Sequence, residues 1–304
     1  MYLHKDKQLL EDIINATSEK YAIETAIIEK DYYVTMILKL LANKNDKIVF
    51  KGGTSLSKCF QVINRFSEDI DITFSEHIGE GKRKKLKYDV MMSISEELEM
   101  PIGNWNEIES DRDLNQYLFQ YDPIAGQYNE AMLPDVKVET ALGSYAFPVE
   151  KAEVTSYVYQ YLLEESEDDL ITEYELKPFS MNVQPLERTY IDKIFALCDY
   201  FMQGQSKRYS RHLYDLYKLQ DRISFDEKFG ELVKEVREHR IKMGQERCPS
   251  AQLEVNIPEK IKEICKTDFY KTDYDAITEY FIHDSVLYED TISNLLTTVE
   301  NGYF

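Results

Sequence analysis

Residues 50–58 read FKGGTSLSK. The apolar run Ile48–Phe50 predicts a short strand, and the glycine pair Gly52-Gly53 predicts a turn that allows a close approach to the backbone. Thr54 and Ser55 follow at an expected helix start, where free N–H groups and the helix dipole favour an anion. This stretch therefore predicts a strand, a phosphate-binding turn and a helix in succession.

A second stretch, residues 65–72, reads RFSEDIDI. Asp69 and Asp71 alternate with Ile70 and Ile72, so on a strand both carboxylates point to the same side. A phosphate-holding turn beside two parallel carboxylates is the arrangement that metal-assisted nucleotidyl transfer needs. A D-x-D pair alone is a weak signal, and the preceding strand, glycine turn and helix make the combination more specific.

The glycine stretch is not a P-loop. That motif needs a glycine just before its lysine and a serine or threonine just after it. The positions on either side of Lys58 hold Ser57 and Cys59. The sequence thus excludes a Walker A nucleotide site here.

The composition describes an acidic chain with a sizeable core. Its 304 residues are 43% hydrophobic and carry a formal net charge of −20. This length is sufficient for one large domain or two ordinary ones. So acidic a chain is not expected to coat nucleic acid through a broad basic surface. A local basic cleft that binds nucleic acid is still compatible with this charge. The charge also favours a basic protein partner. Four scattered cysteines, no signal peptide and no apolar run of about 20 residues predict a cytoplasmic protein that does not enter a membrane.

The first part of the chain mixes helical and strand patterns. Apolar residues at helical spacing predict helices over 6–21 and 24–42. Taken alone, the charged segment 29–33 within the second helix is expected on a solvated face. Period-two alternation predicts further strands over 117–121, 135–140 and 179–183, the last of them closing the sheet. The acidic segment 150–175 is expected to be a loop or helix between these elements.

Beyond Pro185 the apolar residues recur at helical spacing, and no strand pattern of any length remains. Helices are predicted over 187–202, 208–220, 226–242, 258–266, 273–281 and 286–299. We therefore predict an α+β protein. An N-terminal domain over residues 1–185 has a mixed β-sheet flanked by helices, and residues 186–304 form an α-helical bundle.

The acidic residues indicate a metal site. Mg²⁺ prefers oxygen ligands and keeps several waters, so two or three carboxylates on adjacent strands suffice, with Mn²⁺ as the alternative ion. Asp69 and Asp71 are the first two candidate ligands. Glu139 is the third if its strand lies beside theirs, and otherwise it is a charged residue on a solvated sheet face.

These motifs resemble the AbiEii/AbiGii nucleotidyltransferases, toxins of type IV toxin–antitoxin systems in the DNA polymerase β-like superfamily. The resemblance rests first on KGGTSLSK at 51–58 and RFSEDID at 65–71. Three further segments extend it: EKDY at 29–32 is similar to an N-terminal Lys-Asp segment, 187–193 to a Glu/Lys helix, and RHLYDL at 211–216 to an Arg-Asp-x-Tyr-Asp-Leu motif.

The resemblance implies an enzyme whose domain over residues 1–185 is a nucleotidyltransferase domain. It implies metal binding by Asp69 and Asp71. It also implies catalytic roles for Lys193, as a cation on the triphosphate, and for Asp215, near the nucleotide or the incoming hydroxyl. The candidate nucleotide-binding residues are Lys51, Gly52, Gly53, Thr54, Ser55, Lys58 and Arg211.

Two positions depart from the family pattern. His212 stands where the family often has an aspartate, and Asp192 where a glutamate usually precedes the lysine. Neither is a candidate metal ligand. A purely structural alternative also stays open, in which Lys193 and the Arg211–Asp215 segment form an ion-pair network.

The resemblance further implies an NTP as substrate, an RNA acceptor such as tRNA, a separately encoded antitoxin as partner, and a monomer. A second hypothesis keeps the chemistry and transfers the nucleotide to a small molecule or a protein side chain, since an acidic surface attracts cationic acceptors. A third is a non-catalytic interaction protein with this fold, which the filled acidic and phosphate-binding positions disfavour.

Overall fold

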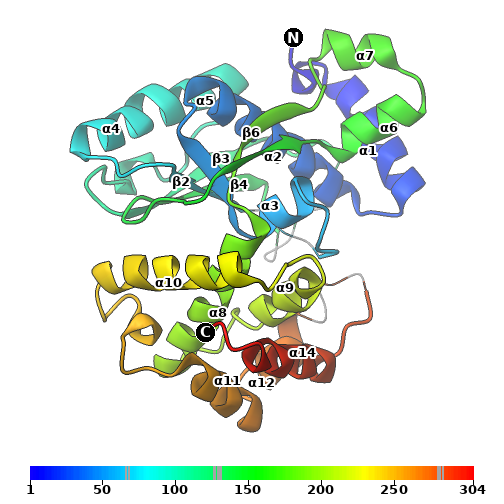
Figure 1. Cartoon of the computed structure of the whole chain (residues 1–304). Coiled ribbons are helices and arrows are strands. Elements are labelled where there is room, and N and C mark those ends of the chain that lie inside the picture. The colour runs from blue at the N-terminus through cyan, green and yellow to red at the C-terminus, as the bar shows by residue number, and fades with distance from the viewer. Residues whose placement is uncertain (66, 68, 126–127, 129–131, 279–281, 283) are drawn as a thin grey trace. The chain divides into compact units, whose positions relative to one another are not determined.

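The computed structural model describes residues 1–65, 67, 69–125, 128, 132–278, 282 and 284–304. The chain divides into two compact units (Figure 1). The first consists of Met1–Phe60 and Ser67–Val183, and the second of Gln61–Phe66 and Gln184–Phe304. The chain therefore leaves the first unit after Phe60 and returns to it at Ser67.

A six-stranded sheet forms the centre of the first unit, in the order β3-β4-β2-β1-β6-β5. Its strands are β1 (Ile48–Lys51), β2 (Ile70–Phe74), β3 (Leu114–Gln120), β4 (Asp135–Ala141), β5 (Glu150–Val154) and β6 (Phe179–Val183). β1 is antiparallel to β2 and parallel to β6, and β2 is parallel to β4. The predicted α+β class with a mixed sheet is confirmed.

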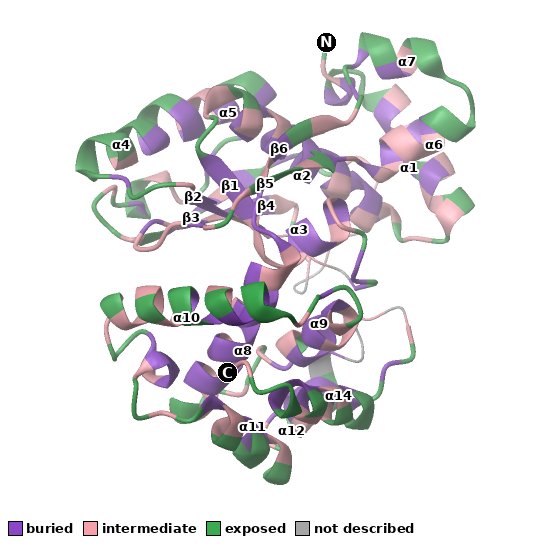
Figure 2. Ribbon diagram, in the orientation of Figure 1, coloured by how far each residue is buried: buried purple, intermediate pink, exposed green. Residues whose placement is uncertain are grey.

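One face of this sheet is buried under helices. Phe50, Ile72, Val138 and Tyr117, from four neighbouring strands, are almost inaccessible to solvent, and α2 (Thr25–Lys44) packs against β4 and β6. Buried residues, purple in Figure 2, line the strands and α2. The other helices of the unit are α1 (Lys7–Tyr21), α3 (Gly52–Lys58), α4 (Glu80–Lys85), α5 (Met92–Leu98), α6 (Tyr157–Glu164) and α7 (Asp168–Glu173).

The sheet differs from the prediction at one edge. β5 lies within the segment that was expected to hold only a loop or helix, and it pairs with β6 to form the edge of the sheet. The expectation that 179–183 closes the sheet is wrong, because β6 lies between β1 and β5. β5 has the sequence EKAEV, in which only Val154 is buried, so it lacks the apolar alternation that reveals a half-buried strand.

Three residues of α2 that were expected on a solvated face are buried and hold other parts of the unit. The Glu29 carboxylate accepts hydrogen bonds from Ile124 N–H at 2.8 Å and from the Tyr128 hydroxyl at 3.0 Å. Lys30 Nζ donates to the Leu133 carbonyl at 3.1 Å. Tyr32 is fully buried. The expectation of solvent exposure is wrong because each polar group has a specific partner inside the unit.

A buried ion pair fixes α3. Lys58, the last residue of α3, donates from Nζ to Asp31 Oδ1 at 2.6 Å and to Thr35 Oγ1 at 2.7 Å, both on α2. It also donates to the Thr155 carbonyl at 3.2 Å. The other Asp31 oxygen accepts from Tyr157 N–H at 3.0 Å. One ammonium thus ties α3 to α2 and to the segment that begins α6.

The second unit is helical, as predicted. Its helices are α8 (Leu186–Met202), α9 (Arg211–Gln220), α10 (Glu227–Lys242), α11 (Ile257–Lys266), α12 (Lys271–Asp273) and α14 (Tyr288–Glu300). α8 packs against α9, α10 and α11, and α14 packs against α9 and α11. The helix predicted over 273–281 corresponds to α12 and a π-helical segment, Tyr274–Thr278, while 279–281 lie outside the described residues. Among the helices described, none is long and apolar enough to cross a membrane.

The Lys58–Asp31 pair provides a stability prediction. We expect Lys58→Met to lower the free energy of unfolding by about 3–5 kcal/mol, because it leaves the largely buried Asp31 carboxylate without its cation. Urea unfolding followed by circular dichroism measures the change. The control is Lys82→Met, which removes a solvent-exposed pair with Glu76 and should leave the unfolding midpoint unchanged. Equal midpoints for the two variants would contradict the assignment.

Candidate active site

The turn between β1 and α3 lies directly against the Asp71 carboxylate. Gly52 has a φ of +81°, a conformation that side-chain-bearing residues rarely adopt. A Cβ built on Gly52 would overlap the Asp71 carboxylate. The glycine therefore serves two purposes: it permits the turn, and it leaves room for an acidic side chain beside it.

Two buried hydroxyls hold the turn and the start of β2 together. Thr54 Oγ1 donates to the Asp69 carbonyl at 2.5 Å and lies 2.9 Å from Ser67 Oγ. Ser55 Oγ donates to the Gly52 carbonyl at 2.8 Å. Both side chains are almost inaccessible to solvent. These hydroxyls thus position the backbone of Gly52 and Asp69.

A row of polar side chains crosses four strands on the face opposite the buried core. Lys51 pairs with Asp71 across β1 and β2, and Asp71 pairs with Glu139 across β2 and β4. Gln116 on β3 pairs with Glu139, and its Nε2 donates to Glu139 Oε1 at 2.9 Å. Residues paired in register point to the same face of a sheet. Glu139 therefore lies beside the D-x-D segment, on the strand next to that of Asp71.

A lysine that sequence reasoning missed lies among these carboxylates. Lys137 Nζ is 3.1 Å from Asp69 Oδ2 and 3.0 Å from Glu139 Oε1. Burial acts to lower the pKa of Lys137, but the Asp69 and Glu139 carboxylates outweigh it and raise that pKa. Lys137 precedes Glu139 by two residues on β4, so its side of the strand could be inferred, but its partner Asp69 could not.

The second unit carries a separate buried cluster around Asp215. The Arg65 guanidinium donates to both Asp215 oxygens, from Nε at 2.7 Å and from Nη2 at 2.8 Å. Lys193 Nζ donates to Asp215 Oδ2 at 2.7 Å. Asp215 is fully buried, and Arg65 and Lys193 are nearly so. Burial acts to raise the pKa of Asp215, but the two cations and their hydrogen bonds bring it well below its usual range.

His212 extends this cluster without adding charge. Its Nδ1 lies 3.3 Å from Lys193 Nζ, and burial together with the Lys193 ammonium lowers the pKa of His212 well below 6.5. A neutral imidazole protonated at Nε2 accepts a hydrogen bond at Nδ1. Burial also lowers the pKa of Lys193, against the opposing attraction of Asp215. With Lys193 charged, two cations and one carboxylate leave the cluster with a net positive charge.

Tyr214, the neighbour of Asp215, binds the same short segment of chain that Asp215 binds. Its hydroxyl accepts from Asn64 N–H at 3.0 Å and donates to Asp284 Oδ1 at 2.7 Å. The Tyr-Asp pair of the 211–216 motif therefore anchors the residues Asn64 and Arg65. Arg65 had no role in the sequence prediction, because its partner is 150 residues away along the chain.

The other residues singled out in the sequence, Lys58, Arg211 and Asp192, differ in their burial and in their ion-pair partners. Lys58 is buried in the ion pair with Asp31, whereas Arg211 is exposed on the first turn of α9. Asp192 accepts from Arg188 Nε at 3.0 Å and from Arg240 Nη1 at 3.5 Å. It therefore belongs to an ion-pair network other than the one around Asp215.

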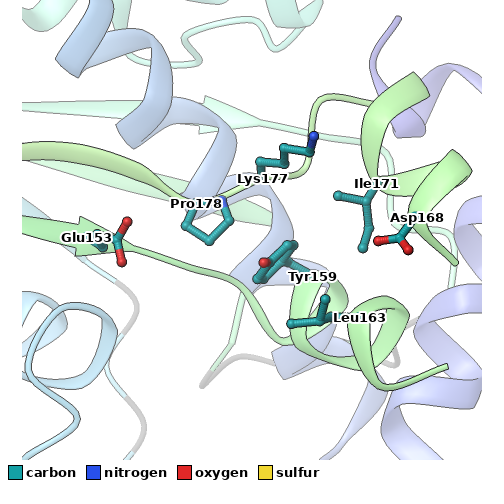
Figure 3. A pocket seen from close by; sticks show the side chains of 7 residues that line it. All are labelled: Glu153, Tyr159, Leu163, Asp168, Ile171, Lys177 and Pro178. Atoms are coloured by element: carbon teal, nitrogen blue, oxygen red, sulfur yellow. The ribbon is translucent and has the colours of Figure 1, made fainter. Parts of the chain in front are cut away.

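A hollow of about 360 Å³ in the first unit contains none of the predicted site residues (Figure 3). It is lined by Glu153, Tyr159, Leu163, Asp168, Ile171, Lys177 and Pro178. Figure 3 shows one cation among side chains of both polar and apolar kinds. The candidate chemistry lies instead on the polar row and the Gly52 turn.

Comparisons with known proteins identify the family and the fold of this chain. Residues 38–289 match the family model described as "Nucleotidyl transferase AbiEii toxin, Type IV TA system". No curated protein matches the sequence. Among solved structures, the fold is similar to that of MenT4, a nucleotidyltransferase toxin from Mycobacterium tuberculosis H37Rv, with a TM-score of 0.54 and 16% sequence identity over 97% of this chain and 88% of that one.

At 16% sequence identity, the similarity to MenT4 shows only that the two proteins share a fold. The family model matches most of the chain and therefore shows the family. The resemblance inferred from the motifs is confirmed. The chain belongs to the AbiEii family of nucleotidyltransferase toxins of type IV toxin–antitoxin systems.

Proposed function

We propose that this nucleotidyltransferase transfers a nucleotide from an NTP to an RNA acceptor such as tRNA, with the help of a divalent metal ion. One observation carries the proposal. The Asp71 carboxylate lies against the Gly52 turn and in register with Glu139 on the neighbouring strand. A carboxylate pair thus adjoins a backbone turn at the place where the motifs predict the triphosphate.

The donor set fits Mg²⁺ or Mn²⁺. Asp69, Asp71 and Glu139 supply the carboxylate oxygens that these ions prefer. Lys137 already holds a positive charge between Asp69 and Glu139, which supports the proposal that a cation is favoured there. Among the described residues no three such groups stand together as a ready metal site, and in this structure the Lys137 ammonium contacts two of the carboxylates. When bound, the metal would neutralise phosphate charge and lower the pKa of the attacking hydroxyl.

The chain's own groups are proposed to bind and orient the triphosphate. The first N–H groups of any α-helix have no partner within the helix, and in α3 these belong to Gly52, Gly53 and the residues just after them. Lys51 adds a cation beside Asp71. Lys193 adds a second cation, and Asp215, held by Arg65 and Lys193, acts as a positioning residue because its depressed pKa keeps it from accepting a proton.

The family implies an antitoxin as partner, and we propose that the protein is a cytoplasmic monomer. Transfer to a cationic small molecule or a protein side chain remains the alternative, supported by the net charge of −20. The two are separated by incubating the protein with labelled NTPs, total RNA and small cationic acceptors. Label in RNA supports the proposal, and label only in another acceptor replaces it.

Removing the carboxylates tests the chemistry. We expect Asp69→Asn/Asp71→Asn to reduce nucleotide transfer at least 100-fold, because the variant loses two of the three proposed metal ligands. Transfer of label from an NTP is the measurement. Glu153→Gln is the control, since this exposed carboxylate lies on β5, away from the polar row, and should leave transfer unchanged. Full activity of the double variant would refute the metal assignment.

The Gly52 turn allows a matched pair of glycine substitutions. Gly52→Ala should reduce transfer at least 10-fold, because its Cβ displaces the Asp71 carboxylate. Gly204→Ala is the control, as Gly204 has a similar φ of +69° and its Cβ would meet nothing within 4 Å. Both variants carry the same backbone strain, roughly 1–2 kcal/mol, which thermal unfolding measures. If transfer fell equally in both, strain rather than the Asp71 contact would be responsible.

The position of Lys137 predicts that its ammonium and a bound metal ion compete for the same carboxylates, which a binding measurement can test without catalysis. Lys137→Met should tighten Mg²⁺ binding about tenfold, since the ammonium and the metal ion compete for Asp69 and Glu139. Isothermal titration gives the dissociation constants, with Lys151→Met on β5 as the control. Unchanged or weaker Mg²⁺ binding in Lys137→Met would show that the lysine and the ion do not share these oxygens.

A further inference from the structure

Three aromatic rings lie parallel beside the Asp215 cluster, in the same unit. Tyr200 on α8 and Tyr209 stack with ring centroids 3.5 Å apart and an interplanar angle of 14°. The His212 ring on α9 is parallel to both, with its centroid 6.1 Å from that of Tyr200 and 6.3 Å from that of Tyr209. All three rings are only half-buried. We call Tyr200, Tyr209 and His212 the ring stack.

The chain around the ring stack is basic, in contrast to the whole protein. No acidic residue occurs between Asp199 and Asp215, a stretch that contains Lys207, Arg208 and Arg211. All three cations are exposed, and within the part of the chain that the structure describes none of them forms an ion pair. These cations are therefore available to an anionic ligand.

A buried carboxylate fixes the loop that carries these groups. Asp273 accepts from Arg208 N–H at 2.7 Å, from Ser210 N–H at 3.2 Å and from Ser210 Oγ at 2.6 Å. Arg208 has a φ of +71°, which these bonds hold in place. Tyr209, between the two anchored residues, is thus presented by an ordered loop, and little ordering entropy is lost when a ligand binds it.

Flat rings flanked by exposed cations suit an unpaired nucleic-acid strand, because rings stack on bases and cations track the phosphates. The formal net charge of −20 disfavours contact between phosphates and most of the protein. His212 also contacts Lys193 of the proposed catalytic cluster. A strand bound at the ring stack would therefore have its end close to that lysine.

We propose that the ring stack binds a base at the single-stranded end of the acceptor RNA, while Lys207, Arg208 and Arg211 bind its phosphates. The assignment rests on the proposed RNA acceptor and adds the residues that recognise it. A triphosphate alone does not account for the exposed Lys207 and Arg208, because other groups are already assigned to it. The proposal moves Arg211, a candidate nucleotide-binding residue, from the triphosphate to the RNA phosphates.

The test uses the full-length protein and a fluorescein-labelled single-stranded RNA of about 10 nucleotides, a length within the usual range for such sites. Binding is followed by fluorescence polarisation without NTP or added metal. Tyr209→Ala should weaken RNA binding about tenfold or more, while Tyr209→Phe, which keeps the ring, should bind within twofold of the original protein. Circular dichroism and thermal unfolding confirm that both variants fold.

A second set of variants tests the role of the cations through the salt dependence of RNA binding. Lys207→Gln/Arg208→Gln should weaken binding and reduce the slope of log K against log salt by about 1.4, since each phosphate contact on a single strand contributes about 0.7. Lys234→Gln/Lys242→Gln, which removes two exposed cations of α10, is the control with the same change in charge and should leave the slope unchanged.

Three results would overturn the assignment. RNA binding unchanged in Tyr209→Ala, in a protein that transfers nucleotides to RNA, shows that the stack is only structural and leaves the proposed function intact. Weaker NTP binding in Tyr209→Ala with RNA binding unchanged assigns the stack to the substrate base instead. If the original protein neither binds nor modifies RNA, the proposed acceptor fails, and this inference fails with it.

Discussion

The close contact between Gly52 and the Asp71 carboxylate is the constraint on which the candidate site depends. It brings together a turn that carries backbone N–H groups and a strand that carries an acid, and it exists because β1 and β2 are hydrogen-bonded neighbours in register. Buried apolar side chains on the opposite face of these strands hold that register, since a slip of one residue would expose them and bury the acids. The core therefore determines the geometry of the polar face.

Each of the two units has a cluster in which carboxylates are paired with cations supplied by the chain itself. Lys137 lies between Asp69 and Glu139, and Arg65 and Lys193 share a third acid, Asp215. The clusters differ in burial. Lys137 is partly accessible and can give up its partners, whereas Asp215 is inaccessible and its loss would leave two buried cations unpaired. The first arrangement suits a site that exchanges ligands, and the second suits a permanent support.

Much of this was predictable because it depends on local pattern. β1, β2, β4 and β6 follow from apolar runs or alternation, and the bundle helices follow from apolar residues at helical spacing. β5 could not be predicted, since an exposed edge strand rich in charge protects the sheet from pairing with other chains and carries no apolar pattern. Lys137 and Arg65 were missed because their roles depend on partners far away in sequence. The catalytic and binding roles of the named site residues stay predictions, while the family and fold are established.

The hexapeptide 61–66 belongs to a unit whose remaining residues begin at Gln184, and this affects how the protein is made. Arg65 leaves the ribosome 150 residues before Asp215. At about 5–20 residues per second, synthesis of that interval takes roughly 8–30 s, during which the Arg65 guanidinium lacks Asp215 and Asn64 lacks Tyr214. The order of synthesis therefore delays completion of this anchor until the C-terminal helices emerge. A nascent toxin acquires the Arg65–Asp215 pair only after residue 215 of its 304 has been made.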